Sequence, residues 1–252
     1  MGDFLKDATS GSGVLARTLD RLIEAAQTRP ATVLNEAAKR GIPLYGHDAA
    51  EALASLRLRP VIQLDPLASS FIRSNALIAG AQGFATNVGG VLTLPIALPA
   101  DTVGSLALIV RATSAVMNSY GFETETEDGA VNLRIGLLAA AGVNKVLVSG
   151  TNILVSELSS RAILHPSGRE LAGALTRSVA DGLGRRLTHR QLARAAPIVG
   201  GAVGAGVNIA LVRATAGRAR RHYRDLLLQW QANQALVTPA LTASSAPSAP
   251  LR

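Results

Sequence analysis

One long uncharged stretch, Ser74–Ala100, constrains this chain more than any other feature. About 20 apolar residues suffice for a transmembrane helix. This stretch is interrupted, however, by polar, glycine and proline residues, namely Asn75, Gln82, Asn87, Gly89, Gly90, Pro95 and Pro99. Irregular backbone is not tolerated where it faces lipid, but it is tolerated when buried in protein. The pattern therefore predicts a buried helical hairpin, with helices at about Pro66–Ala85 and Asp101–Tyr120 and an irregular turn at Thr86–Pro99.

A second uncharged stretch, Ala195–Val212, lies between two basic clusters. A single membrane crossing would place one cluster on the wrong side of the positive-inside rule. A re-entrant or interfacial hairpin, or a soluble bundle resting on a membrane, keeps both clusters on one side. Within the stretch, Gly200, Gly204 and Asn208 are four residues apart and share one helix face. Small residues at this spacing allow close helix packing, so we expect Gly200 and Gly204 to be packing positions.

The rest of the chain predicts further helices. Amphipathic or capped patterns indicate three short helices before residue 60, at Val14–Gln27, Ala31–Arg40 and Asp48–Leu56. Two apolar segments, Ala130–Ala141 and Val146–Leu158, also read as helices, although the second is compatible with two short strands around a Ser-Gly-Thr-Asn turn. The expected fold is all-α: a compact helical bundle whose hydrophobic hairpins, broken by glycine and proline, form the core.

The composition suggests three regions: short N-terminal helices over 1–59, a helical domain over 60–237, and a tail over 238–252. The tail is rich in proline, alanine and serine, which predicts disorder. Near the N-terminus, no apolar run is long enough for a signal peptide, and Lys6 stands where a myristoylation motif needs Ser or Thr. We therefore expect neither an export signal nor an acyl anchor.

Composition also narrows the classes of function. The chain carries 25 basic and 17 acidic residues, for a net charge of +8, and only 3% of its residues are aromatic. Such scarcity argues against a nucleic-acid binder that stacks bases on aromatic side chains. There is no cysteine, the four histidines are isolated, and no hydrolase, zinc-protease or nucleotide-binding motif occurs. We therefore expect no metal site, no cofactor and no recognisable catalytic residue.

A basic segment near the C-terminus is the strongest candidate binding site. On a helix, Arg213, Arg220, Arg221 and Arg224 fall on one side, while Trp230 lies with apolar residues on the other. Basic residues beside an anionic membrane surface each gain about 1 kcal/mol. The alternative is an ordinary solvated face. Nucleic-acid backbone would attract the same charges, but no recognised module accompanies them.

A second candidate is a pocket between the two uncharged stretches. Asp101 precedes an apolar segment, so N-capping explains it, and pairing with Arg111 is also possible. If Asn87 and Asn208 converge with Asp101, the three side chains would form a polar site for a hydrophobic or phosphorylated small molecule. This alternative makes the chain an enzyme or a carrier.

Several motifs together resemble the EcsC family. They are GFATNVGGVLTLPIALPAD (Gly83–Asp101), Tyr120-Gly121, and APIVGGAVGAGVN followed by RATAGRARRHY (Ala196–Tyr223). The resemblance covers about Pro66–Trp230. It implies a mainly bacterial, mostly helical family named after a protein encoded beside an ABC transporter linked to secretion and membrane processes, with no established reaction.

Together these observations give one hypothesis and two alternatives. The hypothesis is a cytoplasmic protein, peripheral to or partly inserted in the inner membrane, that binds anionic lipid or a transporter-like membrane protein. The alternatives are the enzyme or carrier described above and a soluble bundle that binds another protein.

Overall fold

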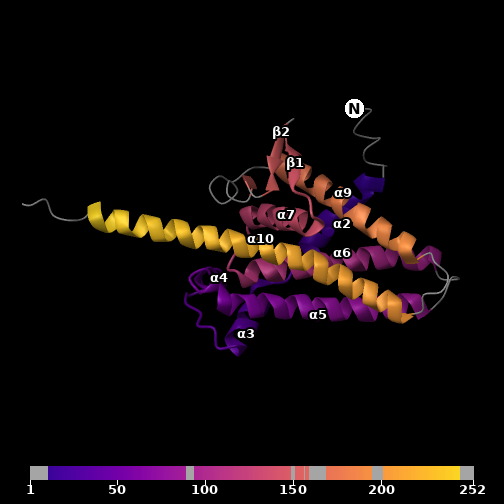
Figure 1. Ribbon diagram of the computed structural model, residues 1–252, viewed down its shortest axis with the longest axis horizontal. Helices are drawn as coiled ribbons and strands as arrows, with labels where there is room; N and C mark the ends of the chain where they lie inside the picture. Colours follow the sequence, from indigo (N-terminus) through magenta and orange to yellow (C-terminus); the bar gives the residue numbers. More distant parts are fainter. Residues whose placement is uncertain are drawn as a thin grey trace, which may run out of the picture.

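A computed structural model describes residues 11–88, 94–148, 151–155, 157–158, 169–194 and 201–244. Its helices pack into a bundle, shown in Figure 1, and the predicted all-α fold is confirmed. The described elements, in chain order, are α2 (Gly11–Ala26), α3 (Pro30–Lys39), α4 (Ala49–Leu56), α5 (Val61–Val88), α6 (Leu94–Ser119), α7 (Glu127–Ala141), β1 (Lys145–Val148), β2 (Thr151–Leu154), α9 (Arg169–Arg194) and α10 (Gly201–Ser244).

Three long helices, α5, α6 and α10, pack against one another along one side of the bundle. Contacts between α5 and α10 run in opposite directions along the two helices: Gly83 lies against Asn208, whereas Asp65 pairs with Arg224. The two helices are therefore antiparallel. They approach closely, because a Cβ built on Gly83 would lie 2.7 Å from the carbonyl oxygen of Gly204.

The predicted hairpin forms, but its turn is shorter than expected. Helix α5 runs to Val88 and α6 begins at Leu94, so most of the range Thr86–Pro99 is helical. Pro95 falls in the first turn of α6, where backbone N–H groups have no acceptor within the helix, and proline is tolerated there. Asp101 consequently lies inside α6, and the expectation that it caps the helix is wrong.

The segment predicted as a helix at Val146–Leu158 begins instead as a β-hairpin. Strands β1 and β2 pair antiparallel, with Lys145 opposite Leu154 and Val148 opposite Thr151. Gly142 ends α7 in the left-handed conformation (φ 70°), which turns the chain away before the first strand. Val, Ile and Thr favour the extended conformation. The strand alternative is therefore correct for this segment.

The N-terminal helices share a single core with the rest of the chain. Leu19 of α2, Val33 of α3 and Leu53 of α4 are fully buried and belong to the same apolar cluster as Leu106 of α6 and Leu227 of α10. Helix α2 packs against α6 and α9, and α3 packs against α4 and α6. The short helices before residue 60 are thus integrated in the bundle.

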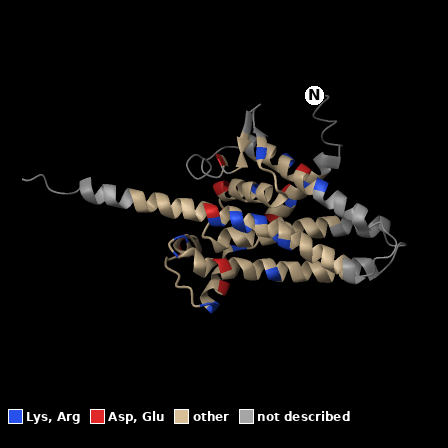
Figure 2. Cartoon of the chain, viewed as in Figure 1, with Lys and Arg blue, Asp and Glu red and all other residues tan. Residues whose placement is uncertain are grey.

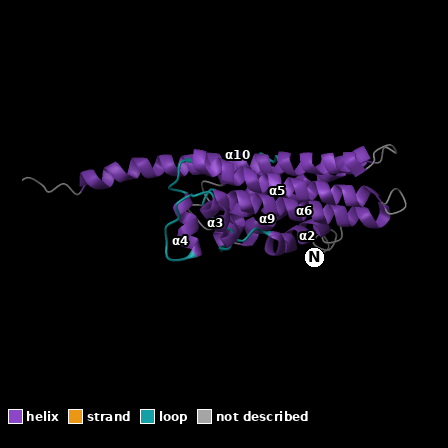
Figure 3. Ribbon diagram, turned by 90° about the horizontal axis from the view of Figure 1, so that it is seen from below, coloured by secondary structure: helices purple, strands orange, loops and turns teal. Residues whose placement is uncertain are grey.

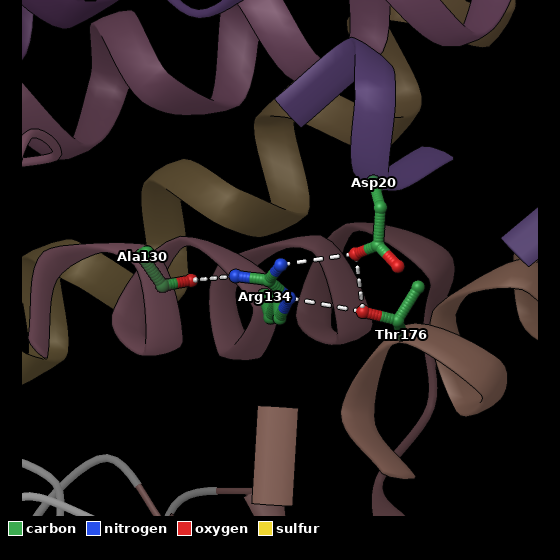
Figure 4. Close-up of polar contacts among 4 residues, drawn as sticks. All are labelled: Asp20, Ala130, Arg134 and Thr176. Atoms are coloured by element: carbon green, nitrogen blue, oxygen red, sulfur yellow. Dashed lines mark hydrogen bonds and ion pairs between the residues drawn. The ribbon is translucent and has the colours of Figure 1, made fainter. Parts of the chain in front are cut away.

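A polar cluster joins α2, α7 and α9 (Figure 4). Arg134 of α7 donates through Nη2 to Oδ1 of Asp20 and through Nε to Oγ1 of Thr176, each at 2.9 Å. Thr176 donates to the same Asp20 oxygen at 2.9 Å, and Nη1 of Arg134 donates to the carbonyl of Ala130. Because every nitrogen of the guanidinium has an acceptor, the cluster is a structural connection between three helices.

Helix α10 is much longer than the other described helices. At about 1.5 Å per residue it spans roughly 66 Å, and its C-terminal part extends past the other helices in Figures 1 and 3. It continues to Ser244, into the segment 238–252 that the sequence predicts as a tail, and an established helix adds residues there without a new nucleation step. Residues 245–252 lie outside the described part of the chain.

Candidate functional site

One end of the bundle is nearly free of charge. It consists of Ser74–Val88 of α5, Leu94–Val110 of α6 and Gly201–Val212 of α10, which we call the low-charge end. Its only ionisable residue in sequence is Asp101. Figure 2 shows the described residues of this end almost entirely without charge, whereas charged residues are spread over the rest of the bundle.

Large apolar side chains are exposed on the low-charge end. On α5, Leu77 is 58% exposed and Phe84 is 52% exposed, and they lie seven residues apart on the same helix face. Ile78 beside them and Val103 on α6 are also exposed. Exposed large apolar side chains that gather at one end of a bundle are candidates for an interaction surface.

Three arginines border this end, one on each helix. Arg73, Arg111 and Arg213 are exposed, and none of them has an ion pair or side-chain hydrogen bond within the described residues. The contacts Gly80–Ile209 and Gly104–Gln82 link the helices inside the low-charge end. Along its own helix, each arginine lies four to seven residues, about 6–10 Å, from the residue that makes one of these contacts. In each helix the arginine lies on the side of that contact that faces the rest of the bundle. We call these residues the arginine border.

The four arginines predicted to form one cationic face do not all face solvent. Arg213 and Arg221 are exposed. Arg220 instead donates through Nη1 to Oγ of Ser69, and Nε of Arg224 lies 3.3 Å from Oδ2 of Asp65. Two of the four are therefore engaged by α5, because α10 packs against that helix along the side that carries them.

Asp65 of α5, which pairs with Arg224, is the centre of a polar group separate from the Arg134 cluster. Its Oδ1 accepts a hydrogen bond from the hydroxyl of Tyr120, which is fully buried at the end of α6. Burial, together with this hydrogen bond to the carboxylate, raises the pKa of Tyr120 far above its usual value. The phenol therefore stays protonated and acts as a donor. The arrangement connects α5, α6 and α10 through one carboxylate.

Of the three side chains in the predicted pocket, the structure describes only that of Asn208. Asn208 is buried and packs against Gly83, so it lies in the contact between α10 and α5. The side chains of Asn87 and Asp101 lie outside the described residues, as does Gly200. Arg111, the partner considered for Asp101, lines a groove between α6, α2 and α3.

The part of the chain that the structure describes contains no group of His, Asp or Glu residues arranged to hold a metal ion. Within the same residues, none of the helices combines the length and apolar character needed to cross a membrane.

The sequence comparison assigns a family. The model of the EcsC protein family matches residues 12–227, which is most of the chain. The chain belongs to the EcsC family. The match begins within α2, so the EcsC region includes the N-terminal helices that precede the motifs recognised from Pro66 onward. No curated protein and no solved structure matches the chain.

Sequence reasoning missed two members of the arginine border in this EcsC chain. Arg73 and Arg111 are isolated in sequence, so neither belongs to a basic cluster. A signal was available for Arg73, which directly precedes the uncharged stretch Ser74–Ala100, as Arg213 directly follows Ala195–Val212. Arg111 adjoins neither stretch. Residues that delimit uncharged segments meet at one level when the segments form antiparallel helices.

Proposed function

We propose that this EcsC-family chain is a peripheral membrane protein that inserts its low-charge end into one leaflet of an anionic membrane. The observation that carries the proposal is the combination of exposed Leu77 and Phe84 with the arginine border. Apolar side chains gain free energy on entering the acyl region, and arginines at its edge interact with lipid phosphates. Along the helices, the exposed apolar side chains lie toward the end of the bundle and the arginines lie behind them. Insertion into a membrane surface requires this order.

The dimensions fit shallow insertion. From Arg73 to Val88 α5 extends about 22 Å, and from Gly201 to Arg213 α10 extends about 18 Å. The hydrocarbon core of a bilayer is about 30 Å thick. The low-charge end is therefore long enough to enter one leaflet and too short to cross both.

Family membership adds a biological setting to the proposal. The family resemblance implies a link to a transporter in secretion-related membrane processes, which favours the cytoplasmic face of the inner membrane as the location. A membrane protein of that kind is a second class of partner for the low-charge end. Its apolar side chains would then pack against protein within the membrane instead of lipid.

The test is vesicle flotation with Leu77→Asp/Phe84→Asp. We expect this double variant to bind vesicles of equal parts phosphatidylcholine and phosphatidylglycerol at least about tenfold more weakly than the wild type, since aspartate is strongly disfavoured in the acyl region. The control is Ile62→Asp, because Ile62 is 80% exposed on the same helix but outside the low-charge end. Circular dichroism checks that each variant folds.

A second variant separates the electrostatic part. Arg73→Gln/Arg111→Gln/Arg213→Gln should reduce binding to the same vesicles at low salt and leave the weaker binding to pure phosphatidylcholine unchanged. Equal flotation of the wild type and the aspartate variant would refute insertion of this end. Absence of wild-type binding to either vesicle would refute direct lipid binding altogether.

A further inference from the structure

A groove of about 340 Å³ lies where the turn between α2 and α3 meets α6. Its polar lining consists of Gln27, Thr28, Arg29, Thr32 and Arg111. The lining contains two arginines, one amide and two hydroxyl groups, but no aspartate or glutamate. Its ionisable groups are therefore all cationic.

The two arginines are available to a ligand. Arg29 comes from the N-terminus of α3 and Arg111 from α6, and both are exposed. Neither guanidinium has an ion pair or hydrogen bond to another residue within the described chain. By contrast, Arg134 uses all of its nitrogens in contacts within the bundle. Two residues that line the groove thus carry guanidinium donors that no other described residue uses.

The turn that carries Arg29 is fixed to α6 by three hydrogen bonds. The N–H of Thr28 donates to Oγ of Ser114 at 2.7 Å, and Oγ1 of Thr28 donates to the carbonyl of Arg111 at 2.9 Å. Nδ2 of Asn118 donates to the carbonyl of Thr28 at 2.9 Å. These contacts hold the backbone of Arg29 next to that of Arg111, so the groove is formed before any ligand arrives.

We propose that this groove binds a phosphomonoester, as a lipid headgroup or as a small soluble phosphate. Two guanidinium groups match a phosphate that presents several oxygens, because each can donate two parallel hydrogen bonds. The volume is near the lower end for small-molecule sites, roughly 300–1,000 Å³, which favours a compact ligand. The hydroxyl of Thr32 and the amide of Gln27 provide further polar contacts for its substituent.

This site goes beyond the proposed membrane insertion. Arg29 lies outside the low-charge end, and binding of a soluble phosphate requires no membrane. Arg111 belongs both to the groove and to the arginine border, so the groove opens at the level where lipid headgroups would lie. The same two arginines could therefore bind the phosphate of a lipid headgroup or that of a small soluble molecule.

The experiment uses the full chain and two probes. Calorimetric titration with glycerol 3-phosphate measures the soluble ligand. Flotation compares vesicles that contain phosphatidic acid, a phosphomonoester, with vesicles adjusted to equal surface charge with phosphatidylglycerol, a diester. The variant is Arg29→Gln/Arg111→Gln. Arg21→Gln is the control, since Arg21 is an exposed arginine of α2 that does not line the groove.

We expect saturable binding of glycerol 3-phosphate, or a preference for phosphatidic acid over phosphatidylglycerol, that Arg29→Gln/Arg111→Gln weakens at least about tenfold and Arg21→Gln preserves. Binding of the soluble probe alone identifies a small phosphate as the ligand, and preference for phosphatidic acid alone identifies the lipid. The proposal is overturned if neither probe binds, or if the variant binds as well as the wild type. Leu77→Asp/Phe84→Asp should retain binding of glycerol 3-phosphate, so failure of membrane insertion is distinguishable from failure of this site.

Discussion

Replacing Gly83 with alanine should lower the free energy of unfolding by about 1–2 kcal/mol. The added Cβ would meet Asn208 at 2.5 Å and the carbonyl oxygen of Gly204 at 2.7 Å, and a backbone atom cannot move aside without displacing α10. Overpacking of this kind costs about 1–3 kcal/mol. Alanine also gains about 1 kcal/mol over glycine in a helix, which offsets part of the loss.

The matched control is Gly206→Ala on α10. A Cβ at Gly206 has no neighbour within 4 Å, so only the gain in helix propensity remains and stability should rise by up to about 1 kcal/mol. Urea denaturation of both variants and the wild type measures the difference. If both alanine variants stabilise the protein, α5 and α10 do not approach as closely as described.

The sequence predicts the helices of this bundle well because most of them carry local signals. Asp48 precedes α4 and accepts from the N–H of Glu51, and Gly142 ends α7 in the left-handed conformation. Such caps and apolar patterns act within one turn of helix. Family membership, recognised from glycine and proline motifs, is likewise shown by the match over residues 12–227.

Local signals fail where a neighbouring element decides the structure. The segment from Val146 onward is apolar and short, and its periodicity alone does not distinguish a helix from a strand that pairs with the next few residues. Its hairpin is held against the bundle by buried Val146, Val155 and Leu158. Those contacts depend on packing that sequence periodicity does not report.

The candidate site shows the same division. The low-charge end follows directly from the uncharged stretches, whereas the direction of each arginine depends on what packs beside it. Arg220 and Arg224 share a helix side with Arg213 in sequence, yet Ser69 and Asp65 of α5 engage the first two. A helical projection gives the angle of a side chain and leaves its neighbours undetermined.

Acidification should destabilise the protein through His222. Burial lowers the pKa of this histidine to about 4, compared with about 6.5 in an unfolded chain. Above pH 6.5 both states are neutral at this residue and stability does not depend on it. Between pH 6.5 and 4 the unfolded state binds a proton that the folded state does not, so folding loses on the order of 3 kcal/mol by pH 4.

The variant His222→Gln isolates this effect, because glutamine keeps a polar side chain that does not titrate. Urea denaturation at pH 7 and at pH 4.5 should show a larger loss of stability for the wild type than for His222→Gln. His47→Gln should behave like the wild type, since His47 is exposed. Carboxylates also titrate in this range, but they do so in all three proteins and cancel in the comparison. A parallel loss in the wild type and His222→Gln would mean that His222 accepts its proton in the folded bundle.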